Sequence, residues 1–154
     1  MDIRQKDLPA QPYLYVDREC PMEGPAIAAA MGSGFAEVFR FVEAAGIAPQ
    51  SMPISVYLEM PAGRMRFRCG VFVSKADAAR ASGPVKADAL PAGPALTATH
   101  VGPYASLNQS HGALWTHMKD NGIAPAMPVW EIFVDDPQTT PEADLRTEIY
   151  RAVG

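Results

Sequence analysis

The stretch from His100 to Pro137 reads HVGPYASLNQSHGALWTHMKDNGIAPAMPVWEIFVDDP, and the fold prediction begins here. In its first half, Leu107, Leu114 and Met118 recur at the spacing of one helix face, which predicts a helix. The second half contains PVWEIFV, a run of β-branched and aromatic residues that is typical of a largely buried strand. The stretch is therefore interpreted as a helix, a short NGIAP connection and a strand.

Glu131 lies at the centre of this apolar strand. A buried carboxylate costs several kcal/mol unless it is partnered, solvated or neutralised. One explanation is a ligand pocket, where Glu131 pairs with a cation or, once burial has raised its pKa, acts as a general base. The other is a structural carboxylate that bonds an arginine of a neighbouring strand, for which Arg66, Arg68 and Arg151 are available.

The helix and strand pattern occurs twice in the chain. Residues 45–61 (AGIAPQSMPISVYLEMP) match residues 121–137 (NGIAPAMPVWEIFVDDP) with one residue of slippage. Extended backwards, the alignment places Phe35 on His111 and three apolar residues on apolar residues, so the helix faces coincide. Each half is predicted to be strand–helix–strand–strand, with repeat one over about 10–73, a linker over about 74–94 and repeat two over about 95–154.

This duplication predicts an α+β fold in a single domain covering residues 1–154. Two β-α-β-β units would pair their antiparallel sheets about a pseudo-two-fold axis, with two helices on one face and a ligand cleft on the opposite, concave face. The remaining local predictions are strands over 11–18, 53–60, 64–73, 95–101 and 145–153, a hairpin turn at 61–63, a short helical turn over 22–31 that Gly32-Ser33-Gly34 breaks or kinks, a helix ended by Gly46, and a helical turn near 139–142.

Side-chain alternation sorts the two central strands into faces. Ile54 and Val56 share an apolar face of the first strand, as Trp130 and Ile132 do in the second. These apolar faces are expected under the helices. The mixed faces, which carry Ser55, Tyr57, Glu59, Glu131 and Phe133, are expected to point into the cleft.

Aromatic residues suggest the walls of such a cleft. Tyr15, Tyr57, Tyr104 and Phe133 are candidates for an aromatic box that attracts flat or cationic ligands through cation–π contacts. As core residues, the tyrosines would need partners for their hydroxyl groups. Trp130 is kept as a candidate lining residue, because strand twist and bulges can change the direction of a side chain.

Composition limits the classes of function. The chain has 154 residues, 48% of them hydrophobic, and a net charge of −4, which argues against a nucleic-acid surface. Cys20 and Cys69 are far apart and lack CxxC spacing, as expected for free thiols in a reducing cytoplasm. Neither a signal peptide nor a run of membrane-spanning length is present. A cytoplasmic domain is predicted.

Motifs for cofactors and metals are not found in the sequence. His100, His111 and His117 are unevenly spaced, and no HxH or HExxH occurs. There is no GxSxG elbow, P-loop or Rossmann glycine pattern. We therefore expect neither a cofactor nor a metal. His111 takes the position of Phe35 in the repeat, which favours a core histidine.

Several motifs resemble one protein family. They are LPAG (90–93), HVGPY (100–104), PVWEIFVDDP (128–137), TPEADL (140–145) and TEIYRAV (147–153). The chain resembles the GyrI-like small-molecule-binding domain, also called the effector-binding domain of bacterial transcription activators. This domain occurs in multidrug-sensing MerR-type and AraC-type regulators. The similarity is strong over 95–154 and mainly topological over 10–73.

The resemblance implies a duplicated β-α-β-β fold with a central aromatic cleft. It also implies that Glu131 takes the place of the family's acidic pocket residue, which binds cationic or polar ligands. Regulators of this type carry a helix-turn-helix domain before the effector-binding domain. Since the similarity begins near Gln11, we expect a stand-alone member that does not itself bind nucleic acid or membranes.

Three hypotheses for function follow. The first is a binding module that senses or sequesters a hydrophobic, aromatic and possibly cationic small molecule in the cleft. The second is a small hydrolase that opens strained, cyclopropane-type electrophiles with Glu131 as general base, as the resemblance implies for some stand-alone members. The third is a protein-interaction module of the gyrase-inhibitor type. Whether the protein is an enzyme, and whether it is a monomer or a dimer, stays open at this point.

Overall fold

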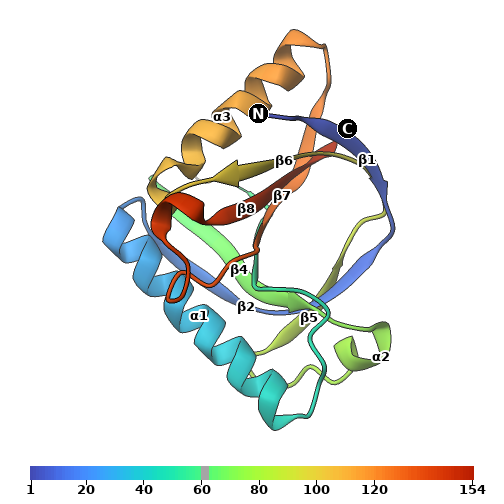
Figure 1. The fold of residues 1–154 in the computed structure, drawn as a ribbon. Coiled ribbons are helices and arrows are strands. Elements are labelled where there is room, and N and C mark those ends of the chain that lie inside the picture. Colours follow the sequence, from blue (N-terminus) through green and yellow to red (C-terminus); the bar gives the residue numbers. More distant parts are fainter. Residues whose placement is uncertain (60–62) are drawn as a thin grey trace.

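The computed structural model describes residues 1–59 and 63–154. Its eight described strands form one curled antiparallel sheet in the order β1-β6-β8-β7-β3-β4-β2-β5 (Figure 1). The strands are β1 (Arg4–Leu8), β2 (Gln11–Pro21), β3 (Ile54–Tyr57), β4 (Arg64–Phe72), β5 (Lys86–Leu90), β6 (Gly93–Val101), β7 (Pro125–Phe133) and β8 (Arg146–Val153). The helices are α1 (Gly24–Ala44), α2 (Lys75–Ala78) and α3 (Leu107–Asp120), with single 3-10 turns η1 (Tyr104–Ser106) and η2 (Glu142–Asp144).

The duplicated topology is confirmed. One half runs β2-α1-β3-β4 and the other runs β6-α3-β7-β8. The two halves meet where β3 pairs antiparallel with β7, and Ser55 lies opposite Glu131 in this pair. The end strands complete the symmetry, because β5 extends the first half beside β2 and β1 extends the second half beside β6. The fold is α+β, with α1 and α3 on one face of the sheet (Figure 1).

Three local predictions are corrected. The segment 74–94, interpreted as a linker, contains α2 and the edge strand β5. Residues 4–8, for which no strand was predicted, form β1. The helix α1 runs without a break through Gly32-Ser33-Gly34. The two residues Pro61 and Ala62 of the predicted hairpin turn lie outside the described residues.

Gly34 has a packing role within α1. A Cβ atom at this position would lie 2.5 Å from the Sγ atom of Cys69 on β4. Such a distance is far inside van der Waals contact, so the helix and the strand approach closely only because residue 34 has no side chain. The close contact explains why a glycine is retained in the middle of a helix despite a cost of about 1 kcal/mol relative to alanine.

The concave face of the curled sheet holds a core to which all eight strands contribute. Leu8 of β1 and Leu90 of β5 belong to the same apolar cluster, although their strands are at opposite ends of the sheet. Trp130 and Tyr150 stack at the centre, with ring centroids 5.2 Å apart. The curl therefore closes the concave face without help from α1 or α3. The other members are Tyr13, Tyr15, Ile54, Val56, Phe72, Ala95, Ile132 and Ala152.

The convex face carries two separate cores, one under each long helix. Val38 and Val42 of α1 pack against residues of β2 and β4, including Val16 and Cys69. Leu114 and Met118 of α3 pack in a different cluster with β6 and β8. The seam between these two cores runs along the pair β3–β7. None of the described helices is both long and apolar enough to cross a membrane.

The predicted grouping of residues into faces is confirmed, but the side on which the helices pack is wrong. Glu131 bonds His111 of α3, so the mixed face lies toward the helices. The apolar face with Ile54, Val56 and Trp130 forms the concave core instead. A curled sheet explains the reversal, because its own end strands bury the apolar face and leave the mixed face for the helices.

Candidate functional site

Glu131 lies at the seam, and its side chain is buried with three hydrogen-bond donors. Its Oε1 atom accepts hydrogen bonds from the hydroxyl of Ser55 at 2.6 Å and from the hydroxyl of Tyr57 at 2.8 Å. Its Oε2 atom accepts one from Nε2 of His111 at 2.7 Å. The two hydroxyl donors come from β3 and the imidazole from α3, so the carboxylate joins both halves of the fold.

These donors determine the ionisation of the carboxylate. Burial by itself raises the pKa of Glu131, but the hydrogen bond and charge of His111, with the bonds from Ser55 and Tyr57, outweigh it and lower the pKa below its usual value. Glu131 is therefore an anion at neutral pH. Burial and the neighbouring carboxylate raise the pKa of Tyr57 well above its usual value, which keeps its hydroxyl a proton donor.

His111 is the member of this hydrogen-bonded group that the sequence did not predict. It was interpreted as a core histidine, but its side chain is 21% exposed and is oriented by Glu131. Since the carboxylate is ionised, Nε2 carries the proton and donates it. The repeat alignment contained a usable signal, because His111 and Phe35 occupy matching positions and both reach the seam. Phe35 contacts Phe133, as His111 contacts Glu131.

An aromatic row lies beside the carboxylate on the same face of β7. The ring of Phe133 makes edge contacts with Phe35 of α1 at 5.7 Å and with Tyr104 of η1 at 5.4 Å, measured between centroids. Phe133 is buried, whereas Phe35 and Tyr104 are partly exposed. The seam therefore offers aromatic edges and faces next to a fixed negative charge.

The structure brings together most of the predicted site residues but not all of them. Ser55 and Tyr57 bond Glu131 directly, and Tyr104 contacts Phe133 next to it. The other two candidates, Trp130 and Tyr15, lie in the concave core on the opposite side of the sheet and do not join this group.

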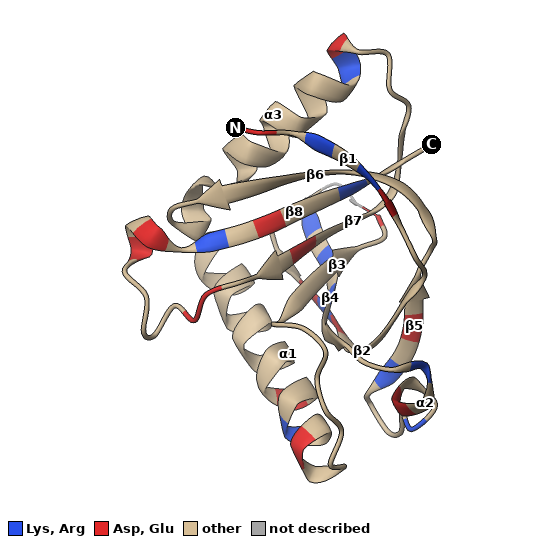
Figure 2. Ribbon diagram, turned by 45° about the vertical axis from the view of Figure 1, so that its right-hand side comes forward, with Lys and Arg blue, Asp and Glu red and all other residues tan. Residues whose placement is uncertain are grey.

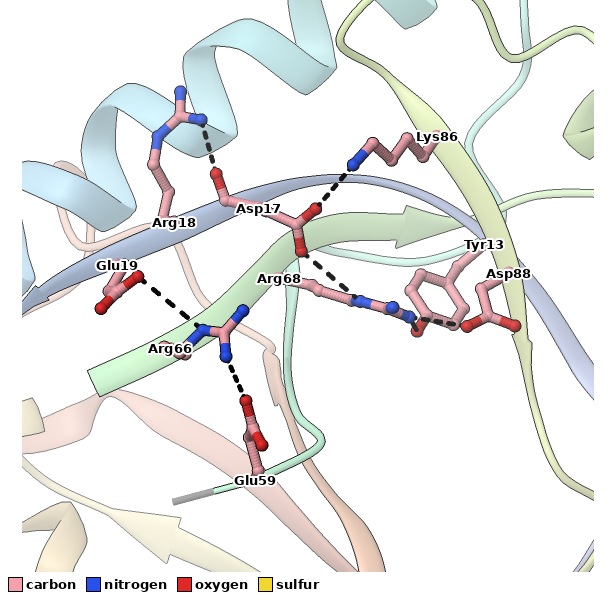
Figure 3. Close-up of polar contacts among 9 residues, drawn as sticks. All are labelled: Tyr13, Asp17, Arg18, Glu19, Glu59, Arg66, Arg68, Lys86 and Asp88. Atoms are coloured by element: carbon pink, nitrogen blue, oxygen red, sulfur yellow. Dashed lines mark hydrogen bonds and ion pairs between the residues drawn. The ribbon is translucent and has the colours of Figure 1, made fainter. Parts of the chain in front are cut away.

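The alternative prediction, that Glu131 pairs with an arginine of a neighbouring strand, is wrong. Arg66 pairs with Glu19 and Glu59, and Arg68 pairs with Asp17 and Asp88 (Figure 3). The guanidinium of Arg151 lies over the ring of Trp115. Of the ionisable side chains that form ion pairs in the described residues, only His111 pairs with Glu131.

A hollow of about 280 Å³ lies elsewhere, where β2, β3 and β4 run side by side. Its charged groups form a paired network, and Arg68 also donates a hydrogen bond to the hydroxyl of Tyr13 (Figure 3). The hollow does not include Glu131, so this concavity and the buried charge are different places. Its lining consists of Asp17, Arg18, Glu19, Val56, Leu58, Glu59, Arg66, Phe67 and Arg68.

The chemistry available at the seam is binding and proton transfer. Within residues 1–59 and 63–154, no group of three or more His, Cys, Asp or Glu side chains is placed to hold a metal ion. The seam contains an ionised carboxylate, an imidazole whose Nδ1 has no bonding partner among the described residues, and a partly exposed aromatic row. This combination can bind an aromatic molecule, and its imidazole can accept a proton.

Comparison with solved structures supports the fold. The chain superimposes on the EcmrR C-terminal domain with a TM-score of 0.80 and 18% identity, over 99% of this chain and 97% of that one. EcmrR in a complex with DNA gives a TM-score of 0.81 and 19% identity over 99% of this chain. The present chain spans only 57% of that EcmrR chain.

Two further structures share the fold at lower similarity. SAV2435 bound to tetraphenylphosphonium gives a TM-score of 0.67 and 13% identity, over 100% of this chain and 94% of that one. A hydrolase from Listeria innocua gives a TM-score of 0.62 and 14% identity, over 99% and 91% respectively. No curated protein sequence matches the chain.

A family model covers almost the whole sequence. The model of the GyrI-like small molecule binding domain matches residues 1–153. This match includes both halves of the duplicated fold, the seam and the two end strands. The chain belongs to the GyrI-like small-molecule-binding domain family.

Proposed function

We propose that the chain binds an aromatic small molecule at the seam between α1 and α3, over Glu131 and the aromatic row, and acts as an effector-binding or sequestering domain. The observation that carries the proposal is the buried, ionised Glu131, which both halves of the fold hold in place. A protein that needed only stability would gain as much from an apolar residue of similar size at this position.

The aromatic row supplies the second part of the argument. Phe35 and Tyr104 are partly exposed, and both contact Phe133. An aromatic ligand that contacts this row replaces water on aromatic surface, and each such aromatic contact is worth about 0.5–1.5 kcal/mol beyond the area buried. The family description and the drug-bound relative SAV2435 support the same class of ligand.

His111 controls how the site responds to the charge of a ligand. It already occupies Oε2 of Glu131. A cationic ligand must displace the imidazole to reach this oxygen, and a protonated imidazole competes more strongly than a neutral one. A neutral aromatic ligand binds without this exchange.

The test uses two probes, neutral N-phenyl-1-naphthylamine and cationic tetraphenylphosphonium. We expect saturable binding of the neutral probe by fluorescence titration, weakened about tenfold by Tyr104→Ala, which corresponds to about 1.4 kcal/mol. Glu131→Gln should weaken binding of the cation more than binding of the neutral probe. Leu58→Ala is the control, since Leu58 is exposed and lines the separate hollow.

The effects of Tyr104→Ala and Leu58→Ala on binding decide the result. Saturable binding that Tyr104→Ala weakens and Leu58→Ala leaves unchanged supports the proposal. Failure of both probes to bind, or equal effects of the two variants, contradicts it. Thermal unfolding of each variant shows that a loss of binding does not come from a loss of folding.

A second candidate function is hydrolysis, favoured by the His111–Glu131 pair. Glu131 is a poor general base, because both of its oxygens accept hydrogen bonds and its pKa is lowered. His111 fits the role better, with Nδ1 accepting a proton from water while Glu131 stabilises the imidazolium. The water oxygen would bond a carbon of a strained ring, and the broken ring bond would leave its electrons on an adjacent carbonyl, which is then protonated.

The hydrolysis candidate has its own test. A cyclopropane-bearing electrophile is incubated with the wild type, His111→Gln and Glu131→Gln, and the ring-opened product is measured. Turnover that His111→Gln abolishes and Glu131→Gln reduces supports the base assignment. Ligand that binds and is recovered unchanged identifies the chain as a binder only.

A further inference from the structure

Arg151 of β8 lies on the helix-bearing face of the sheet, beside the proposed site. Its guanidinium carbon is 5.1 Å from the centre of the Trp115 ring on α3. Within the part of the chain that the structure describes, Arg151 has no salt bridge, and its Nε is buried without a hydrogen-bond acceptor. Trp115 is 46% exposed, which is high for a tryptophan.

An unpartnered, partly buried guanidinium is costly. A buried donor without an acceptor loses its hydrogen bonds to water without gaining one in the protein, and the loss is larger when the donor is charged. Burial lowers the pKa of Arg151 with no carboxylate acting against it. In α3 the acidic and basic residues lie at one end only (Figure 2), and the only acidic side chain of that helix is Asp120. Glu148 instead accepts a hydrogen bond from Tyr150 on the concave side.

The position of Arg151 relative to Glu131 follows from sheet register. Arg151 pairs with Val129, which is two residues before Glu131 on β7. Strand spacing and rise place the Cα atoms of Arg151 and Glu131 about 8 Å apart. On α3, Trp115 follows His111 by one helical turn and lies on the same side of the helix. The pair Arg151–Trp115 therefore lies next to the pair Glu131–His111, two residues away along β7 and one helical turn away along α3.

We infer that Arg151, with the exposed ring of Trp115 beside it, is an anchor for an oxyanion group of the ligand, so that the seam takes aromatic carboxylates, sulfonates or phosphates in preference to aromatic cations. Guanidinium groups bind such oxyanions through two parallel hydrogen bonds, and the neighbouring indole supports an attached ring. This inference rests on the proposed function and names the class of ligand.

The balance of charge at the seam supports an anionic ligand. Glu131 already has a donor on each oxygen, including the imidazole of His111. Arg151 has no salt bridge in the described residues, and its Nε has no acceptor there. The unmet requirement of the site is therefore an acceptor for Arg151 and not a cation for Glu131.

The test compares two fluorescent probes that differ mainly in one sulfonate. These are 1-anilinonaphthalene-8-sulfonate and N-phenyl-1-naphthylamine. We expect wild-type protein to bind the sulfonate at least about tenfold more tightly, a difference of about 1.4 kcal/mol. Arg151→Gln should weaken binding of the sulfonate far more than binding of the neutral probe and so remove this preference, and Arg151→Lys should keep part of it.

A matched control is present on the same strand. Arg146→Gln removes an exposed arginine of β8 that pairs with Asp135, and it should leave the preference unchanged. Equal affinity of wild-type protein for the two probes overturns the inference and leaves the proposed function standing. A preference that Arg146→Gln removes as fully as Arg151→Gln also overturns it, because net surface charge then explains the binding. If neither probe binds, the proposed function fails as well.

Discussion

Two groups of charged residues in this protein differ in surroundings more than in composition. At the seam, the carboxylate of Glu131 is 5% exposed and is held by Ser55, Tyr57 and His111. Along β2 and β4, the guanidinium of Arg68 is shared between Asp17 and Asp88, whose side chains are 55% and 49% exposed (Figure 3). Both groups satisfy their charges, but only the first does so away from water.

The difference shows which charges depend on particular protein partners. Water can replace any partner of Asp17 or Asp88, so that network costs little to form and contributes little to stability. Water cannot replace the partners of Glu131, so each donor there is needed. The pKa of Asp88 is also lowered, with burial opposing and Arg68 favouring the charged form, but half-exposure weakens this effect. The seam is therefore the more informative place.

The largest expected effect comes from removing the buried carboxylate. Glu131→Ala leaves the hydroxyl groups of Ser55 and Tyr57 buried without their acceptor, and should lower the free energy of unfolding by about 3–5 kcal/mol. Asp88→Ala should lower it by less than about 1 kcal/mol. Urea denaturation of both variants measures the difference. Similar losses in the two variants would contradict the distinction between the two groups.

Lowering the pH should also show how much the ionised Glu131 contributes to stability. Because the pKa of Glu131 is lower in the folded protein than in the unfolded chain, its stabilisation is complete above the unfolded value of about 4.3 and is lost as the pH falls through the folded pKa. The Glu131→Gln variant should lose less stability than the wild type between about pH 5 and about pH 3. Thermal unfolding across this range measures the slopes, and parallel curves would show that Glu131 does not titrate as described.

A smaller effect is expected from removing one donor. Tyr57→Phe deletes the hydroxyl that donates to Oε1 of Glu131 at 2.8 Å and leaves the bonds from Ser55 and His111. The loss in unfolding free energy should be about 1.5–3 kcal/mol, the range for a hydrogen bond to a charged group. The pKa of Glu131, followed by NMR, should rise because a donor to the anion is missing. An unchanged pKa would mean that the other donors alone set it.

The smallest effect concerns salt. Raising the salt concentration to about 1 M shortens the screening length to about 3 Å and weakens exposed ion pairs. The difference in stability between the wild type and Asp17→Asn should fall from less than about 1 kcal/mol to near zero. The corresponding difference for Glu131→Gln should hardly change, because the carboxylate is buried. Urea titrations at two salt concentrations test both statements together.

The sequence predicts the repeated units well because their pattern is strong. The alignment of residues 45–61 with 121–137 and the alternation in the two central strands give the α+β duplication and the correct grouping of Ser55, Tyr57 and Glu131 on one face. These predictions depend only on local periodicity, and local periodicity survives in the folded chain. They also place the buried carboxylate at the junction of the halves, where β3 pairs with β7.

The side on which the helices pack could not be predicted, because periodicity does not give curvature. The end strands β1 and β5 contribute Leu8 and Leu90 to the concave core, but their sequences, RQKDL and KADAL, are mostly exposed and lack an apolar alternation. A pattern that does not reveal those strands therefore predicts helices over the apolar face. His111 was missed for a related reason, since its role depends on a partner twenty residues away.

The division of the apolar residues into one shared core and two helix cores has a consequence for how such domains diverge. The concave core ties all eight strands together, while the seam lies on the opposite face of the sheet, where Tyr57 and Phe35 also belong to the core under α1. Substitutions at the seam therefore leave the residues of the concave core unchanged. We expect relatives to keep this architecture while their seam residues vary, in agreement with the fold shared at identities of 13% and 19%.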